Sequence, residues 1–241
     1  MRDTKDYSSK TLKGRNLAWL VATLVLDVLI LLVLAFHTAI QDLTPTAIEA
    51  VRTSLTVLLP IPVLILSSLI SADHKAMLVF WRVKFPLPGS RAFSVYAPAD
   101  HRIDLAKLKK NVGAFPVEPR EQNAKWYGLY KQVDSDPSVA DSHKNYLLFR
   151  DIAAMSILLV PVLPVAMYFI GVDATRILIT AAVFLCQYLI TAFSARTTGI
   201  RFVQNVLAVH ASRKVTPTAN RDGKGVTRTL LALLRRSKLS R

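Results

Sequence analysis

The sequence predicts an all-α membrane protein with four transmembrane helices, both termini in the cytoplasm, and a helical cytoplasmic domain between helices 2 and 3. The first observation behind this fold class is compositional: 52% of the 241 residues are hydrophobic and the mean hydropathy is +0.34, although the formal net charge is +15. The second is that the apolar residues gather in four long runs. Together they exclude a soluble globular domain, a disordered chain and a disulfide-stapled scaffold, because none of these combines such values.

The four apolar runs define the expected spans. They cover approximately residues 17–36, 53–72, 152–170 and 177–195. Each is close to the roughly 20 residues that an α-helix needs to cross a hydrocarbon core of about 30 Å. The chain accordingly divides into a basic cytoplasmic N-terminus (1–16), a transmembrane hairpin (17–72), a cytoplasmic loop domain (73–150), a second transmembrane hairpin (151–195) and a basic cytoplasmic helical tail (196–241).

The basic residues fix the expected orientation. Of the 31 Lys and Arg residues, five precede residue 17, thirteen lie in 73–150, eleven follow residue 195, and one lies in each remaining connector. Cytoplasmic segments beside membrane spans carry the excess of Lys and Arg, so both termini and the long loop are expected in the cytoplasm. The expected location is a plasma membrane, of the bacterial inner-membrane kind.

The loop 73–150 is rich in aromatic residues and contains several helix signals. A short basic helix is expected at 104–111. Glu118-Pro119 predicts a helix start, after which apolar residues through Val133 share one helical face. Asp136-Pro137 opens a further helix that is expected to continue into the third span. The loop is near the lower size limit for an independent core, so its aromatic side chains are expected to pack against the ends of the spans or against another subunit.

The tail is expected to continue the fourth helix to about residue 211. After a linker at 215–225, residues 226–241 combine Leu with Arg and Lys, which is typical of a basic amphipathic helix on an anionic membrane surface. The alternative is a tail whose charges only satisfy the orientation bias. The bilayer, including its anionic lipids, is therefore an expected partner.

One carboxylate lies inside the expected membrane region. Asp27 is near the middle of the first span, where an ionised carboxylate costs roughly 2.5–3.5 kcal/mol on insertion scales. Such a residue needs a partner, and Gln187 on the fourth span is a candidate. The pair predicts either a proton or cation site along a pathway, or a protonated Asp that makes one interhelical hydrogen bond.

Proline pairs interrupt two of the spans and are candidate hinges. Pro60 and Pro62 lie in the second span, and Pro161 and Pro164 lie in the third. Each removes a backbone hydrogen bond and weakens its helix. Pro60 and Pro164 are at a similar depth, about seven residues or roughly 10 Å from the outer end of the span. Two helices that are weakened by proline at the same depth could form a gate. The same arrangement also occurs in an ordinary irregular helix bundle.

The loop contains cationic, aromatic and amide side chains that suit an anionic ligand or a partner protein. The candidate binding residues are Arg91, Arg120, Gln122, Asn123, Trp126, Tyr127, Tyr130 and His143. Arginine supplies charge, aromatic rings stack on planar groups, and amides supply directional hydrogen bonds. A nucleotide-type anion fits this set, although the sequence has no Gly-rich phosphate loop. The alternative is a packed face next to the membrane with solvated charges.

The sequence contains no HExxH, G-x-S-x-G, Walker A, GxGxxG or CxxC motif. Its histidines do not have the spacing of metal ligands. Its single cysteine, Cys186, lies in an apolar run and excludes an intrachain disulfide. Neither a metal nor a cofactor is expected. A lipid-modifying enzyme that uses His74, His101 and His143 at the interface stays an alternative. Nucleic acid is not an expected partner, because membrane topology already explains the positive charge.

These observations favour a non-enzymatic, oligomeric membrane protein. Its cytoplasmic loop and tail would bind a partner, and its spans would act as a channel-like or membrane-perturbing effector. Four spans are too few to enclose a pathway in one subunit, so a homo-oligomer is expected. Bacterial anti-phage effectors are similar in general layout, which is an analogy only. The alternatives are a membrane scaffold or assembly factor without conduction, a lipid-modifying enzyme, and a small transporter built as a dimer.

Overall fold

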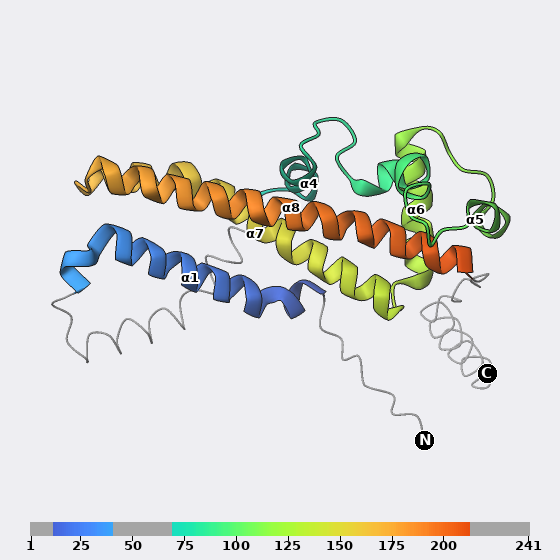
Figure 1. Cartoon of the computed structure of the whole chain (residues 1–241), viewed down its shortest axis with the longest axis horizontal. Coiled ribbons are helices and arrows are strands. Elements are labelled where there is room, and N and C mark those ends of the chain that lie inside the picture. The colour runs from blue at the N-terminus through green and yellow to red at the C-terminus, as the bar shows by residue number, and fades with distance from the viewer. Residues whose placement is uncertain (1–11, 41–68, 213–241) are drawn as a thin grey trace, which may run out of the picture.

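The computed structural model describes residues 12–40 and 69–212, and this part of the chain is helical and contains no strand (Figure 1). Three sequence features lie outside the described residues: most of the second expected span with Pro60 and Pro62, the basic N-terminus up to residue 11, and the tail beyond residue 212. The expectations that concern them stay predictions.

Three described helices are long and apolar enough to cross a membrane. They are α1 (Leu12–Ile40), α7 (Pro137–Phe169) and α8 (Ala174–Ser212). They match the first, third and fourth expected spans, and the long apolar runs therefore predicted them correctly. Helices α7 and α8 have 33 and 39 residues, which corresponds to roughly 50 and 58 Å at 1.5 Å per residue. Both are much longer than is needed to cross a hydrocarbon core, so part of each helix would extend beyond the membrane.

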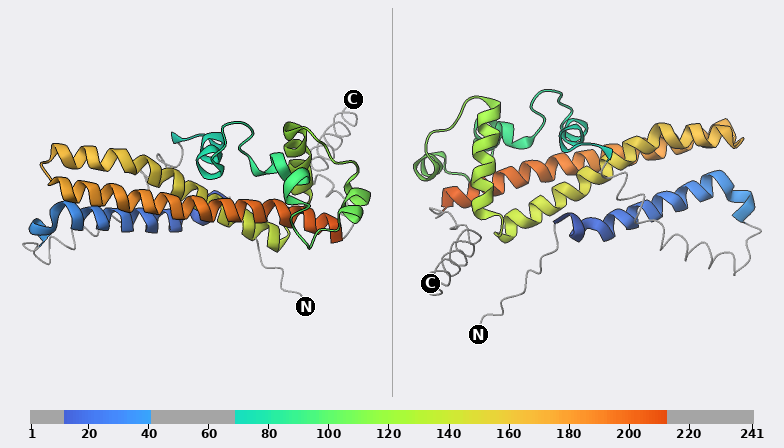
Figure 2. Two further views of the ribbon diagram at one scale, coloured as in Figure 1. Left: turned by 45° about the horizontal axis from the view of Figure 1, so that its top comes forward. Right: turned by 180° about the vertical axis from the view of Figure 1, so that it is seen from behind.

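Helices α7 and α8 form an antiparallel hairpin that runs the length of the molecule (Figures 1 and 2). We call residues 152–169 and 174–195 its apolar half, and residues 137–151 and 196–212 its polar half. Helix α1 lies along α7 and packs Leu20 and Leu24 against Ile152 and Met155. The continuation of both helices across the boundary between the two halves confirms the expected extensions at Asp136-Pro137 and beyond residue 195.

The shorter helices cover the polar half of the hairpin (Figure 2). They are α4 (Ala72–Phe80), the 3₁₀-helix η1 (Pro88–Arg91), the π-helix η2 (Ala92–Tyr96), α5 (Leu105–Val112) and α6 (Pro119–Val133). With the polar half they make up what we call the polar bundle. Their starts follow local chemistry, since the Asp104 and Asp136 carboxylates cap α5 and α7 and proline occupies the first turn of α6.

One hydrophobic core holds the polar bundle together. The face of α6 that contains Trp126 and Tyr130 packs on α8, where Phe202 meets both rings edge-on at centroid distances of 5.1 and 5.2 Å. At Gly199 of α8 the backbone is approached so closely that an added Cβ would lie 2.9 Å from the Tyr146 ring. The loop aromatics therefore pack against the extensions of the long helices, as the size of the loop predicted.

Helix α4 is fixed to α7 and α8 by buried polar contacts. The Lys75 ammonium lies 2.9 Å from the Asp151 carboxylate, and both side chains are 5% exposed. The Arg150 guanidinium lies 3.1 Å from the same carboxylate. The Tyr188 hydroxyl donates to the Leu78 carbonyl at 2.8 Å. The contacts of Lys75 with Asp151 and of Tyr188 with Leu78 join segments more than 70 residues apart in sequence, so sequence patterns did not indicate them.

Candidate ligand-binding site

Five of the eight candidate binding residues line one cavity between α6, α7 and α8. We call this space, of about 320 Å³, the aromatic cavity. The five are Asn123, Trp126, Tyr127, Tyr130 and His143, and the other lining residues are Leu87, Pro88, Lys131, Tyr146, Leu147, Arg150 and Phe202. Its volume is in the lower range of pockets that hold small molecules.

Stacked rings form the walls of the aromatic cavity. The His143 imidazole is parallel to the Phe202 ring, with a centroid distance of 4.4 Å and an interplanar angle of 3°. The Trp126 and Tyr130 rings are also stacked, at 5.9 Å and 13°. The Tyr130 hydroxyl lies 3.1 Å from His143 Nδ1. These contacts hold the rings rigidly, so a planar ligand group would meet preformed aromatic faces.

Cations flank the cavity, and none of its lining side chains is acidic. The Lys131 ammonium lies 5.5 Å from the centroids of both Tyr127 and Tyr130, within range of a cation–π interaction. Arg150 contributes a second cation, although Asp151 pairs with it. Since Asp151 is shared by Arg150 and Lys75, this group of three retains a net positive charge. The electrostatic environment therefore favours an anion.

Two buried donors beside the cavity have no acceptor among the described residues. These are Trp126 Nε1 and the Tyr146 hydroxyl hydrogen, and the Arg150 guanidinium donates towards the Tyr146 oxygen. Both side chains line the cavity, although the two polar atoms are themselves closed off from solvent. A buried polar group without a partner costs about 1–3 kcal/mol, and such groups are rare in folded proteins. Both groups could donate to a ligand only if neighbouring side chains moved to expose them.

Burial keeps the ring nitrogens and hydroxyls of this site uncharged. Burial, together with the nearby Arg150 and Lys131 cations, lowers the pKa of His143 to about 4. Burial also raises the pKa of Tyr130. At neutral pH the imidazole is therefore neutral, and its Nδ1 shares a hydrogen bond with the Tyr130 hydroxyl, the direction of which depends on the tautomer. The positive charge of the site comes from Lys131 and Arg150 alone.

The other three candidate residues have different surroundings. The Gln122 side chain is buried, where its Oε1 accepts from the Phe93 and Ser94 amides and its Nε2 donates to the Val117 carbonyl. Its hydrogen bonds therefore hold η2 against α6. The Arg91 guanidinium lies over two aromatic rings of the polar bundle. Neither residue lines the aromatic cavity.

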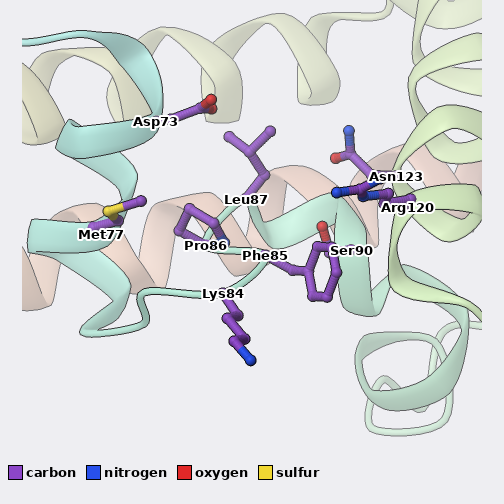
Figure 3. Close-up of a pocket in the computed structure, with 9 residues that line it drawn as sticks. All are labelled: Asp73, Met77, Lys84, Phe85, Pro86, Leu87, Ser90, Arg120 and Asn123. Carbon is purple, nitrogen blue, oxygen red and sulfur yellow. The ribbon is translucent and has the colours of Figure 1, made fainter.

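Arg120, the third, lines a second cavity on the other side of Leu87 and Asn123. This cavity has a volume of about 700 Å³ and is also lined by Asp73, Met77, Lys84, Phe85, Pro86 and Ser90. Figure 3 shows Asp73 and Met77 on one side of it and Arg120 and Asn123 on the other. The space is wider and contains an acidic residue, so it is less selective for anions than the aromatic cavity.

Sequence reasoning missed four lining residues that matter for the chemistry: Lys131, Tyr146, Arg150 and Phe202. Tyr146 and Arg150 follow His143 at positions i+3 and i+7, so the face of α7 that contains His143 was a usable signal. Nothing local indicated Phe202, because it enters the site from α8, more than 50 residues further along the chain.

The structure brings together the two candidate intramembrane residues. Gln187 Nε2 donates to Asp27 Oδ1 at 2.9 Å, which joins α1 to α8. Asp27 Oδ2 is buried, and no residue in the described part of the chain hydrogen-bonds to it. Helix α7 continues through Pro161 and Pro164 to Phe169, so these prolines do not end it. Whether either pair takes part in conduction stays a prediction.

Taken together, residues 12–40 and 69–212 form an all-helical structure with three candidate membrane spans and a cation-flanked aromatic cavity next to them. Within the described ranges, no group of three His, Cys, Asp or Glu side chains is placed to hold a metal ion. No known protein family, characterised protein or solved structure matches this chain.

Proposed function

We propose that this protein is a ligand-responsive membrane effector. The aromatic cavity binds a small anion that has a planar group, and the spans respond in a channel-like or membrane-perturbing way. The protein is not an enzyme in this proposal, and it acts as a homo-oligomer in a bacterial inner membrane, where a role in anti-phage defence fits its layout. The polar bundle and both termini face the cytoplasm.

The observation that carries the proposal is the cavity itself, with aromatic walls and flanking cations, beside two buried donors that have no acceptor among the described residues. Trp126 Nε1 and the Tyr146 hydroxyl would donate to an anionic or carbonyl oxygen. Lys131 and Arg150 would neutralise the ligand charge, and the rings would stack on its planar part. On an ordinary solvated protein face, water would accept hydrogen bonds from such donors.

The long helices provide a route from the cavity to the spans. His143, Tyr146 and Arg150 lie on the polar half of α7, which continues without a break into its apolar half. Phe202 lies on α8, which is equally continuous. A ligand that changes the packing of α7 against α8 would therefore act directly on two candidate spans, with no flexible linker between site and membrane.

The orientation and the assembly rest on charge and on span number. The Lys and Arg residues flank the cytoplasmic ends of the proposed spans, which supports a cytoplasmic polar bundle. Few spans cannot surround a pathway alone, so conduction needs several copies. A protein that stays monomeric in mild detergent and in lipid discs would refute the effector proposal.

The first test measures ligand binding. The probe is the trinitrophenyl derivative of ATP, a planar aromatic anion, titrated against the protein in lipid discs. Lys131→Gln is expected to weaken binding by about tenfold or more, because a hydrogen bond to a charged group contributes about 1.5–3 kcal/mol. Lys107→Gln is the matched control. Lys107 is exposed on α5, so this substitution removes the same charge at a position away from the cavity. Equal weakening by both variants would mean that only net charge is sensed.

The second test measures the response of the spans. Ion flux is recorded from liposomes that contain the protein, with and without the same probe. The proposal expects probe-dependent flux that Lys131→Gln reduces and that Asp27→Asn alters. Binding of the probe with no flux under any condition would favour the scaffold alternative instead.

A further inference from the structure

The five-residue segment between α4 and the first proline of the next turn, Trp81–Phe85, is exposed at every position although it is mainly apolar. We call it the interfacial loop. It alternates three large apolar residues with two cations, Arg82 and Lys84. Val83 is 80% exposed, Trp81 46% and Phe85 40%. Three large apolar side chains are rarely exposed next to one another on a soluble protein. We therefore expect another surface to cover this segment.

The backbone of the interfacial loop is strained at both ends. Trp81 and Phe85 both have φ of 51°, in the left-handed region that bulky residues rarely adopt. Such a conformation costs of the order of 1–3 kcal/mol and persists where function or packing requires it. Here it occurs at the two exposed aromatic residues that bracket the loop.

Contacts of Trp81 place the interfacial loop at the boundary between the two halves of α8. The indole meets the Phe193 ring edge-on at 5.5 Å, and its Nε1 donates to the Tyr188 hydroxyl at 3.2 Å. The Arg196 guanidinium lies 5.6 Å from the centre of the same indole. Phe193 is itself 58% exposed on the apolar half, so the exposed apolar surface of the span continues directly onto the loop.

We propose that the interfacial loop inserts Trp81 and Val83 into the headgroup region of the cytoplasmic leaflet, where Arg82 and Lys84 contact anionic phospholipid headgroups, while Phe85 packs against Arg120 at the other end of the loop. The occupant is a bilayer because the loop continues a candidate lipid-facing surface and alternates apolar and cationic side chains. Tryptophan and basic residues are the groups that favour this depth. The inference rests on the membrane placement in the proposed function and adds a second lipid contact that the spans do not provide.

Anchoring would also fix one wall of the larger cavity. Lys84 and Phe85 line that cavity, and the Arg120 guanidinium of α6 lies 5.7 Å from the centre of the Phe85 ring. Figure 3 shows the Lys84 side chain extending away from Arg120 and Asn123. The loop would thus connect the bilayer surface with α6 of the polar bundle.

The test uses one fluorescent label per molecule in the full-length protein. In a Cys186→Ala background, single cysteines replace Val83, Val117 or, on the spans, Ile190 and Val165, and each carries an environment-sensitive nitrobenzoxadiazole label. Val117 is the aqueous control, because it is 85% exposed beyond α5. Ile190 and Val165 are the membrane controls, at 67% and 56% exposed. The protein is placed in discs of phosphatidylglycerol and phosphatidylcholine that contain a spin-labelled lipid.

The expected result is that lipid spin labels quench the Val83 position to within about twofold of the span positions, while aqueous iodide quenches only Val117. Iodide quenching of Val83 equal to that of Val117 would overturn the inference. So would protection of Val83 from both quenchers, which would mean that protein, for example a second copy, covers the loop. Absence of lipid quenching at both Ile190 and Val165 would overturn the membrane placement and the inference with it.

The anionic part of the proposal has its own test. In discs with phosphatidylglycerol, the double variant Arg82→Gln and Lys84→Gln is expected to shift the equilibrium of the Val83 label away from the membrane by roughly 30-fold. In discs of phosphatidylcholine alone, the same variant is expected to change little. Lipid quenching that is unaffected by the double variant in both kinds of disc would overturn the assignment of anionic headgroups.

Discussion

Removal of a single oxygen from Tyr146 tests the proposed site most directly. The residue is 5% exposed, and its hydroxyl hydrogen has no acceptor among the described residues, because the Arg150 guanidinium beside it can only donate. Tyr146→Phe keeps the ring that packs against Phe80 and Phe202 and removes only the unpaired group. We expect the free protein to become more stable and its affinity for the trinitrophenyl-ATP probe to fall.

The magnitude follows from burial. An unsatisfied buried hydroxyl costs about 1–3 kcal/mol, and almost the whole of this group is out of solvent. Relief of about 1 kcal/mol corresponds to a rise in Tm of roughly 2–4 °C for a chain of this size. Loss of one donor to a ligand is expected to weaken probe binding about fivefold to tenfold.

Tyr188→Phe is the matched control. Its hydroxyl is also buried, but it donates to the Leu78 carbonyl and accepts from Trp81 Nε1. The same substitution therefore breaks hydrogen bonds, and it is expected to lower Tm while probe binding stays unchanged. The two variants should move stability in opposite directions.

The assay is thermal unfolding of the purified protein in detergent, followed by the loss of soluble monodisperse protein on size-exclusion chromatography. Probe titration in lipid discs supplies the affinity. A decrease in Tm for Tyr146→Phe of the same size as for Tyr188→Phe would refute the reasoning, because it would show that the Tyr146 hydroxyl has a partner in the free protein.

Three further predictions concern the polar bundle. A Cβ on Gly89 would lie within 2.6 Å of side chains of α6, whereas Gly128 has open space around it. Gly89→Ala is therefore expected to lower the stability by about 1–3 kcal/mol. Gly128→Ala is expected to raise it by about 0.5–1 kcal/mol, and Tm measures both changes. Lys75→Met leaves Asp151 with Arg150 as its remaining ion-pair partner and is expected to cost about 3 kcal/mol, so an unchanged Tm would contradict the role of the Lys75–Asp151 ion pair. His143 has its pKa lowered from 6.5 to about 4, so its contribution to stability is complete above pH 6.5 and is lost as pH falls towards 4; at pH 5 the loss is at most about 2 kcal/mol, and His143→Phe should remove that part of the pH dependence of Tm.

The elements that local chemistry specifies were predictable. Glu118-Pro119 and Asp136-Pro137 marked the starts of α6 and α7, and the apolar runs marked the described spans. Capping, proline placement and periodicity act over a few residues, so a single sequence contains the whole signal. Local sequence patterns did not indicate the 3₁₀-helix η1 or the π-helix η2, because buried contacts from a distant segment, such as those of Gln122, stabilise this region.

The candidate site was predictable only in part. The aromatic and amide residues of α6 were identified because they lie close together in sequence. Gln122, in the same stretch, makes structural hydrogen bonds, since its side chain lies on the buried side of α6. Composition alone cannot distinguish these two roles for neighbouring residues.

By itself the sequence determined that this chain has long apolar helices and that charged residues flank them. It also determined where helices such as α6 and α7 begin. These properties depend on residue type and on short-range spacing. The tertiary structure decided which side chains share a space. Phe202 meets Trp126 and Tyr146, Lys75 meets Asp151, and Trp81 meets Phe193 only when α4, α6, α7 and α8 pack together. Cavities, orphaned donors and exposed loops arise from such long-range packing, and spacing along the chain does not encode them in readable form.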